Sequence, residues 1–257
     1  MRTPGDETRR RILRRRTGVP ACSARQPYVG IRHTGAGVRI AVIGAGTVGS
    51  GVAAAAAKAG HEVVLASRHP EHAAAVAGET GARAAQTADA AADGADMVVL
   101  AVPSTAVANV CDQIRRHVSG KIIVDPTNPL ETDLSGVLEA TVSVAEEIAI
   151  LLPGASVVKA FNTVLGRRLT EPVVDGVRLD GFYAGNDARA NAAVAELVAA
   201  MGFRPLDAGL LRAARSLEHL GFLNVSLNAR HGWSWSSGWK LLGDTGDNDT
   251  PDRHPPT

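Results

Sequence analysis

Three glycines in the stretch "GAGTVG" have the spacing of a phosphate-binding turn. Gly44, Gly46 and Gly49 form a G-x-G-x-x-G pattern that follows an apolar run and opens an Ala-rich helical stretch. In that context Gly44 permits a tight turn, Gly46 lets the backbone approach a diphosphate, and Gly49 allows close contact between helix and strand. The turn residues Gly44, Ala45 and Gly46 are therefore predicted to bind a nucleotide diphosphate at a helix N-terminus. A glycine-rich turn without a ligand is the alternative.

The stretch "VVLASRHPEH" places Ser67 and Arg68 where the second strand of such a unit ends. An acidic residue there would accept hydrogen bonds from a free ribose 2′-hydroxyl and would repel a 2′-phosphate. A hydroxyl and a guanidinium instead suit the dianionic phosphate of NADP, so the predicted coenzyme is NADP(H). His72, one helical turn further, could add positive charge, but a solitary histidine on a surface helix is more often a bystander.

Further candidates follow the later apolar runs. Val102 and Pro103 are predicted at the carboxyl edge of the sheet, to receive the nicotinamide end of the coenzyme; an ordinary strand-ending proline is the alternative. Asn162 and Thr163 follow another run and are predicted to contact a ligand, whereas Lys159 is more often structural than a catalytic acid. The sequence shows no defensible Ser-His-Asp order, no H-E-x-x-H and no C-x-x-C. We therefore predict neither a catalytic side chain nor a metal site.

These residues depend on strands and helices that alternate from residue 38 onward. Helical patterns of 10–15 residues between apolar runs indicate right-handed crossovers and a Rossmann-type, doubly wound parallel sheet of the α/β class. The predicted strands are 38–44, 62–67, 82–85, 95–103, 121–127, 155–161, 181–186 and 203–209. The predicted helices are 47–59, 70–78, 107–118, 143–152, 188–201 and 210–229.

Charge and composition limit the kinds of partner. Among the 257 residues, positions 1–37 hold nine arginines and two acidic residues, which leaves 18 basic and 24 acidic residues in the remainder. The mildly acidic body argues against nucleic-acid binding, and the basic arm is predicted to be a disordered leader. No apolar run is long enough to span a membrane or to serve as a secretory signal. Cys22 and Cys111 have no metal-ligand spacing, so we expect a reduced, cytoplasmic protein.

Several motifs together resemble the NADPH-dependent reductases of the deazaflavin coenzyme F420. The motifs "RIAVIGAGTVG", "SRHPE", "VVLAVP", "DPTNPL", "SVAEEIAILLPGASVVKAFNTV", "AGND", "RPLDAGLLRAARSLE" and "SGWKLL" occur in the order of that family. The resemblance covers about residues 38–242, and related groups such as pyrroline-5-carboxylate reductases share its N-terminal domain. It implies a Rossmann domain over 38–165 and a small C-terminal α/β substrate domain over 166–242 that closes a cleft. Residues 243–257 lack apolar content and are predicted to be a disordered tail.

The resemblance also implies roles for particular residues. Thr47 and Val48 would contact the phosphates, Asn162, Thr163 and Val164 would bind the deazaflavin, and Trp233 would lie against its ring. The implied reaction is direct hydride transfer between NADP(H) and coenzyme F420 as co-substrate, in a homodimer. Trp233 and Trp235 stand where the family has a smaller loop, so an imine, quinone or metal-chelate acceptor remains an alternative, as does a non-catalytic NADP-binding redox sensor.

Overall fold

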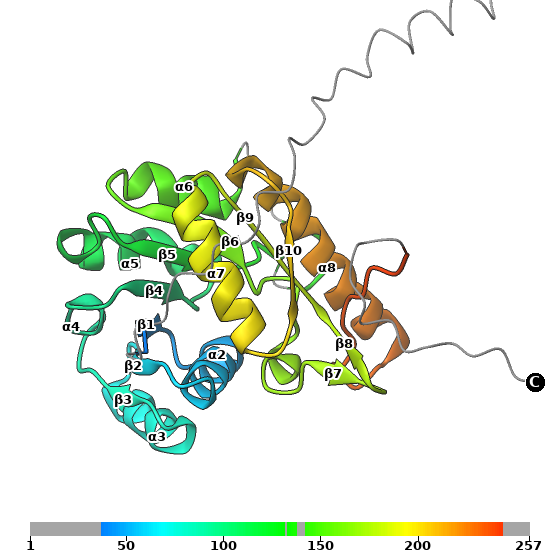
Figure 1. Ribbon diagram of the computed structural model, residues 1–257, viewed down its shortest axis with the longest axis horizontal. Helices are drawn as coiled ribbons and strands as arrows, with labels where there is room; N and C mark the ends of the chain where they lie inside the picture. Colours follow the sequence, from blue (N-terminus) through cyan, green and yellow to red (C-terminus); the bar gives the residue numbers. More distant parts are fainter. Residues whose placement is uncertain (1–36, 132, 138–141, 244–257) are drawn as a thin grey trace, which may run out of the picture. The chain divides into compact units, whose positions relative to one another are not determined.

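The computed structural model describes residues 37–131, 133–137 and 142–243. The strands are β1 (Arg39–Ile43), β2 (Glu62–Ala66), β3 (Arg83–Ala84), β4 (Met97–Leu100), β5 (Ile122–Asp125), β6 (Ser156–Ala160), β7 (Val173–Val174), β8 (Val177–Arg178), β9 (Asp180–Gly185) and β10 (Arg204–Asp207). The helices are α2 (Thr47–Lys58), α3 (Pro70–Thr80), α4 (Ala88–Ala92), α5 (Val107–Ile114), α6 (Val144–Leu151), α7 (Ala188–Ala200) and α8 (Ala214–His231) (Figure 1). Short 3-10 turns span Ser104–Ala106, Arg115–His117, Gly166–Leu169 and Leu211–Ala213.

Eight strands form one sheet in the order β10-β9-β6-β5-β4-β1-β2-β3. All neighbours are parallel except β6 and β9, which pair antiparallel. Strands β7 and β8 form a separate two-stranded ribbon. Because β1, β2, β4, β5 and β6 are parallel, their carboxyl ends meet at one edge of the sheet, where ligands bind in folds of this kind.

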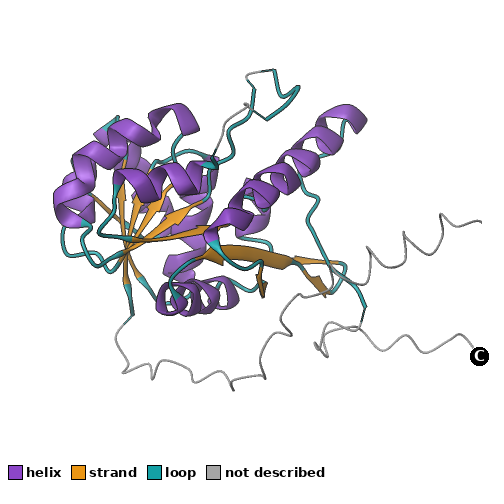
Figure 2. Cartoon of the chain, turned by 90° about the horizontal axis from the view of Figure 1, so that it is seen from above, coloured by secondary structure: helices purple, strands orange, loops and turns teal. Residues whose placement is uncertain are grey.

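Two helical layers cover the two faces of the sheet (Figure 2). On β1, Ile40 and Val42 pack into one core cluster with α2, α3 and α7, while Ala41 and Ile43 pack into the other with α4, α5 and α6. This alternation explains why the central parts of β1, β2 and β4 are apolar on both faces, since both faces are buried. The Ala-rich α2 has the small side chains that close approach to the sheet requires.

The predicted fold class, a Rossmann-type α/β sheet, is confirmed. All eight predicted strands and six predicted helices are present, with ends that shift by a few residues. Three short elements were not predicted from the sequence: α4, which has five residues, and the two-residue strands β7 and β8. Strands β9 and β10 continue the main sheet, and the division into domains at residues 165 and 166 stays a prediction. The predicted leader and tail lie, except for residues 37 and 243, outside the described residues.

Candidate coenzyme site

The glycine-rich turn joins β1 to α2 at the carboxyl edge of the sheet. Gly44 has a φ of +115°, and a Cβ atom there would lie 2.0 Å from the carbonyl oxygen of Ala101. A Cβ at Gly49 would lie 1.8 Å from the carbonyl oxygen of Gly44, so packing within the chain requires both glycines. A Cβ at Gly46 would meet nothing within 4 Å. The open space at Gly46 is therefore available to a ligand, as the predicted approach of a diphosphate requires.

The first turn of α2 leaves its N–H groups available. Gly46 is the N-cap and provides no side-chain hydrogen bond, and the first turn contains no acidic residue. Thr47 is exposed and Val48 is partly buried at this end of the helix. Free N–H groups and the positive end of the helix dipole favour a bound anion here. The arrangement fits a coenzyme diphosphate, with the backbone rather than charged side chains as donor.

A cavity of about 560 Å³ extends from this turn toward the ends of β2 and β4. Of the residues predicted to bind the coenzyme, those from the turn, from the end of β2 and from the end of β4 line one cavity: Gly44, Ala45, Gly46, Ser67, Arg68, Val102 and Pro103. The described lining residues include no aspartate or glutamate, and they include the basic side chains of Arg68, His69 and His72. The cavity therefore suits a ligand that is more negative than an ordinary dinucleotide.

Ser67 and Arg68 differ in how far the fold already uses them. The Ser67 hydroxyl donates to the carbonyl oxygen of His69 at 2.8 Å and accepts from its N–H at 3.2 Å, which holds the loop after β2 in a turn. Arg68 is exposed, and no hydrogen bond or ion pair of its side chain is present in the described part of the chain. Its guanidinium is therefore available to bind a phosphate bidentately.

His72 contacts the glycine-rich turn, which the sequence did not predict. Its Nε2 lies 3.1 Å from the carbonyl oxygen of Ala45, so α3 is tied to the glycine-rich turn, and the imidazole lines the cavity. His72 is exposed on its helix, as predicted, and that it takes no part in coenzyme binding stays a prediction. Gln86, Asn109 and Gln113 also line the cavity and were not predicted, because amides on ordinary surface positions carry no distinctive sequence signal.

The residues predicted to hold the acceptor lie just beyond β6. Asn162, Thr163 and Val164 are buried, and the preceding Phe161 adopts a φ of +65°. The Asn162 amide donates to Asn128 Oδ1 at 2.9 Å and to the carbonyl oxygen of Leu217 at 2.8 Å, which fastens this loop to α8. The Thr163 hydroxyl is buried. These contacts use both hydrogens of the Asn162 amide, whereas its Oδ1 atom and the Thr163 hydroxyl have no hydrogen-bond partner among the described residues.

Trp233 is not brought beside these residues within this chain. Helix α8 contacts the loop at Gly221, where an added Cβ would lie 2.8 Å from the carbonyl oxygen of Asn162. The helix then continues to His231, a further distance of roughly 15 Å at 1.5 Å per residue. Trp233 follows that end, is 47% exposed and stacks on His231 with ring centroids 5.1 Å apart.

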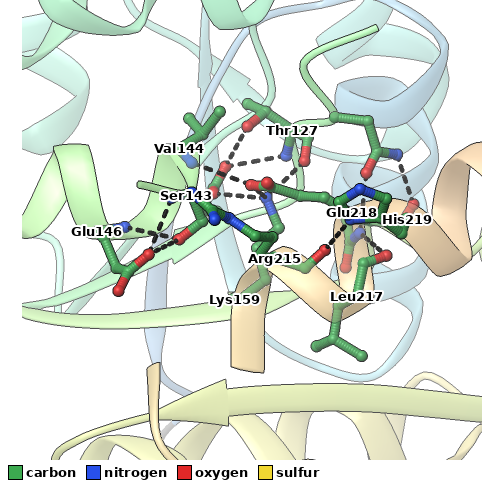
Figure 3. Close-up of polar contacts among 12 residues, drawn as sticks. Thr127, Ser143, Val144, Glu146, Lys159, Arg215, Leu217, Glu218 and His219 are labelled. Carbon is green, nitrogen blue, oxygen red and sulfur yellow. Dashed lines mark hydrogen bonds and ion pairs between the residues drawn. The ribbon is translucent and has the colours of Figure 1, made fainter. Parts of the chain in front are cut away.

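Lys159 and Glu218 lie together in a buried ionic cluster (Figure 3). Asp125 is its third member, and the three residues are called the Lys159 cluster. Its ammonium lies 2.8 Å from Asp125 Oδ2 and 2.9 Å from Glu218 Oε1, and it donates to the carbonyl oxygen of Thr127 at 2.6 Å. Glu218 also accepts from the N–H of Val144 at 3.0 Å. The fully buried Lys159 joins β5, β6 and α8, and its ammonium is not exposed to a substrate.

No group of three or more His, Cys, Asp or Glu side chains is arranged to hold a metal ion in the described part of the chain. Among the same residues, no helix combines the length and the apolar character needed to cross a bilayer.

Comparison with known proteins supplies independent information. A family model described as "NADP oxidoreductase coenzyme F420-dependent" matches residues 39–129. The F420-dependent NADP reductase of Methanothermobacter thermautotrophicus is 34% identical over 212 residues, which cover 76% of this chain and 90% of that protein. A solved structure of a provisionally assigned F420-dependent NADP reductase from Arthrobacter sp. FB24 is 31% identical, with a TM-score of 0.70, and covers 80% of this chain and 100% of that chain.

A relative of another kind matches as well. Metalloreductase STEAP3 of Rattus norvegicus is 31% identical over 180 residues, which cover 70% of this chain. The match covers 36% of that protein, so the chain spans about a third of its length.

Proposed function

The chain belongs to the coenzyme F420-dependent NADP oxidoreductase family, and from this premise we propose that it transfers a hydride directly between NADP(H) and coenzyme F420. It is an NADP-dependent oxidoreductase. In the direction of F420 reduction, NADPH gives a hydride to the deazaflavin carbon that replaces N5 of a flavin, a proton is taken up from water, and NADP⁺ and reduced F420 are formed.

The proposal is supported by the combination of an open glycine-rich turn and a cavity whose described lining contains no carboxylate. The space at Gly46 and the free N–H groups of α2, including those of Thr47 and Val48, would hold the diphosphate. Ser67 and Arg68 would hold the 2′-phosphate, since Arg68 has no competing partner in the described residues. An acidic lining residue would have favoured the coenzyme without that phosphate.

The chain would contribute position and exclusion of water rather than a reacting side chain. Val102 and Pro103, at the end of β4, would direct the nicotinamide toward the ends of β5 and β6. The loop of Asn162, Thr163 and Val164 would then border the acceptor, with the Thr163 hydroxyl and Asn162 Oδ1, which have no partner among the described residues, as its hydrogen-bonding groups. Holding two flat rings at about 3–3.5 Å contributes several kcal/mol to the rate without an acid or a nucleophile.

A second copy of the chain is part of the proposal. Leu223 on α8 and the indoles of Trp233 and Trp235 are 45%, 47% and 43% exposed, an apolar group that a homodimer contact would cover. Trp233 would then lie against an acceptor only if the partner chain brought it there. Light scattering coupled to gel filtration measures the molecular mass directly. The mass of a monomer at micromolar protein concentration would refute the proposed homodimer. We also expect the enzyme to act in the cytoplasm.

The decisive experiment mixes the protein with NADPH and oxidised F420. The visible absorbance of the deazaflavin should fall at a rate proportional to enzyme concentration, and Arg68→Glu should slow it at subsaturating NADPH. An unchanged absorbance, in a sample that binds NADPH by fluorescence titration, would refute F420 as the acceptor.

A second candidate is reduction of another acceptor, such as a metal chelate, an imine or a quinone. It is favoured by the similarity to a metalloreductase and by the position of Trp233 away from Asn162 in this chain. The same protein would then oxidise NADPH with ferric chelates or quinones but not with F420. Binding of NADPH without oxidation by any acceptor would instead indicate a redox sensor.

A further inference from the structure

Three amide side chains line the coenzyme cavity and take no part in the contacts proposed so far. Gln86 precedes α4, and Asn109 and Gln113 belong to α5. All three are exposed. A phosphate binds cations and backbone N–H groups better than neutral amides, whereas an amide suits an uncharged group that has both a donor and an acceptor. The three amides therefore point to a further, uncharged part of the coenzyme.

Asn109 and Gln113 form a pair on one face of α5. The Gln113 Nε2 atom donates to Asn109 Oδ1 at 3.0 Å, across one helical turn. This bond leaves Asn109 Nδ2 as a donor and Gln113 Oε1 as an acceptor, neither with a partner in the described part of the chain. Because each amide holds the other, the pair loses less side-chain freedom on binding a ligand than two separate amides would. The pair therefore offers one donor and one acceptor in a fixed arrangement.

The pair faces the part of the cavity that suits the adenosine half of the coenzyme. The described lining includes no residue after Gln113, and so none from the ends of β5 and β6, toward which the nicotinamide would be directed. It does include Arg68, the proposed partner of the 2′-phosphate. The base is attached to the ribose carbon next to the one that carries this phosphate. Helix α4 contacts both β2 and α5, so a base that leaves the ribose near the end of β2 is directed toward α4 and α5.

Apolar side chains complete the surface around the pair. Ala88 at the start of α4, Ala106 just before α5 and Val110 on α5 line the same cavity. Small apolar side chains pack on the flat face of a ring, while a few polar groups bind its edge and set its orientation. The arrangement fits a purine whose edge carries one donor and one acceptor.

We propose that Asn109 and Gln113 recognise the adenine base of the coenzyme by its 6-amino edge and make the enzyme selective for adenine over hypoxanthine. The proposal rests on the coenzyme placement proposed above. The 6-amino group of adenine donates to Gln113 Oε1, and the ring nitrogen beside it accepts from Asn109 Nδ2. Asparagine and glutamine bind an adenine edge in the same way when proteins recognise DNA. Hypoxanthine carries an oxygen in place of the amino group, so two acceptors would face each other at Gln113.

Deamino-NADPH, in which hypoxanthine replaces adenine, tests the proposal without a change in the phosphates or the nicotinamide. A titration of dihydronicotinamide fluorescence gives the dissociation constants of NADPH and deamino-NADPH alike, because both contain the same reduced ring. The wild-type protein should bind deamino-NADPH at least about fivefold more weakly than NADPH. Equal affinities for the two coenzymes would overturn the proposal.

Gln113→Met and Asn109→Leu remove one amide each and keep a side chain of similar size at an exposed position. Each should reduce the ratio of the two dissociation constants to less than about twofold, mainly by weakening the binding of NADPH. Arg116→Met is the control, because Arg116 is exposed beyond the end of α5 and outside the cavity lining, and it should keep the wild-type ratio. Gln86→Met tests whether the third amide recognises the base instead. A wild-type ratio in both α5 variants, or a ratio that falls only in Gln86→Met, would overturn the proposal.

Two coenzyme fragments provide a second measurement that needs no variant. The nucleotide 2′-AMP contains adenine, ribose and the 2′-phosphate, and 2′-IMP contains hypoxanthine instead of adenine. In competition with NADPH for the wild-type protein, 2′-AMP should bind at least about fivefold more tightly than 2′-IMP. Equal competition by the two fragments, or none by 2′-AMP, would overturn the proposal. Failure of NADPH itself to bind would refute the proposed coenzyme site instead, so the two failures are distinguishable.

Discussion

Replacing Arg68 by glutamate should convert the proposed 2′-phosphate site from attractive to repulsive. Arg68 is exposed at the cavity and has no partner in the described residues, so the change should not disturb the fold. A charge-assisted hydrogen bond contributes about 1.5–3 kcal/mol, less at an exposed site, and the new carboxylate adds repulsion. We therefore expect NADPH to bind at least about 2 kcal/mol more weakly, roughly thirtyfold.

The assay is a titration of coenzyme fluorescence with NADPH and with NADH. NADH lacks the 2′-phosphate, so its affinity should change less than about threefold. Arg116→Glu is the matched control, because Arg116 is exposed, has no recorded partner in the described residues and lies outside the cavity lining. Equal losses for NADPH and NADH in Arg68→Glu, or equal losses in both variants, would refute the reasoning.

The remaining predictions concern the glycine turn, a helix cap and a thiol. Gly46→Ala should have the melting temperature of the wild type and bind NADPH at least about tenfold more weakly. Gly44→Ala should have a lower melting temperature, because its Cβ would lie 2.0 Å from a backbone oxygen. Equal decreases of the melting temperature in the two variants would contradict this reasoning. The backbone N–H of the serine N-cap lowers the pKa of Glu146, so its stabilisation is present above the unfolded-state pKa and is lost as the pH falls through the lowered one. Glu146→Gln should therefore cost about 0.5 kcal/mol in urea unfolding at pH 7 and nothing at pH 2; a constant difference would disprove a charge effect. Burial raises the pKa of the Cys111 thiol to about 12. In a Cys22→Ser protein, Cys111 should therefore react with a disulfide reagent only after unfolding. Rapid labelling of Cys111 in the native protein would contradict this prediction.

The glycine-rich turn and the loop after β2 could be placed from the sequence because their signals are local. A buried strand, a glycine turn and a helix follow one another within about 30 residues, so spacing alone places Gly44, Gly46 and Gly49. Ser67 and Arg68 follow the next strand, and the topology requires that strand to end beside the turn. The structure places these segments around one cavity as expected.

His72 and Lys159 show why the rest could not be predicted. The contact of His72 with Ala45 joins residues 27 positions apart, and a histidine on a polar helix face carries no signal of such a contact. Lys159 has partners 34 and 59 positions away, and only the packing of α8 against β5 and β6 brings them together. The position of Trp233 likewise depends on the length and direction of α8.

The sequence by itself determined the fold class, the glycine-rich turn and the cationic end of β2, because residue type and short-range spacing restrict the backbone directly. Only the tertiary structure decided which charges are buried together, which hydroxyls are already used and which side of the molecule the tryptophans occupy. Those properties depend on distances between segments that are remote in the chain, and hydrophobic periodicity specifies that a face is buried without specifying what it is buried against.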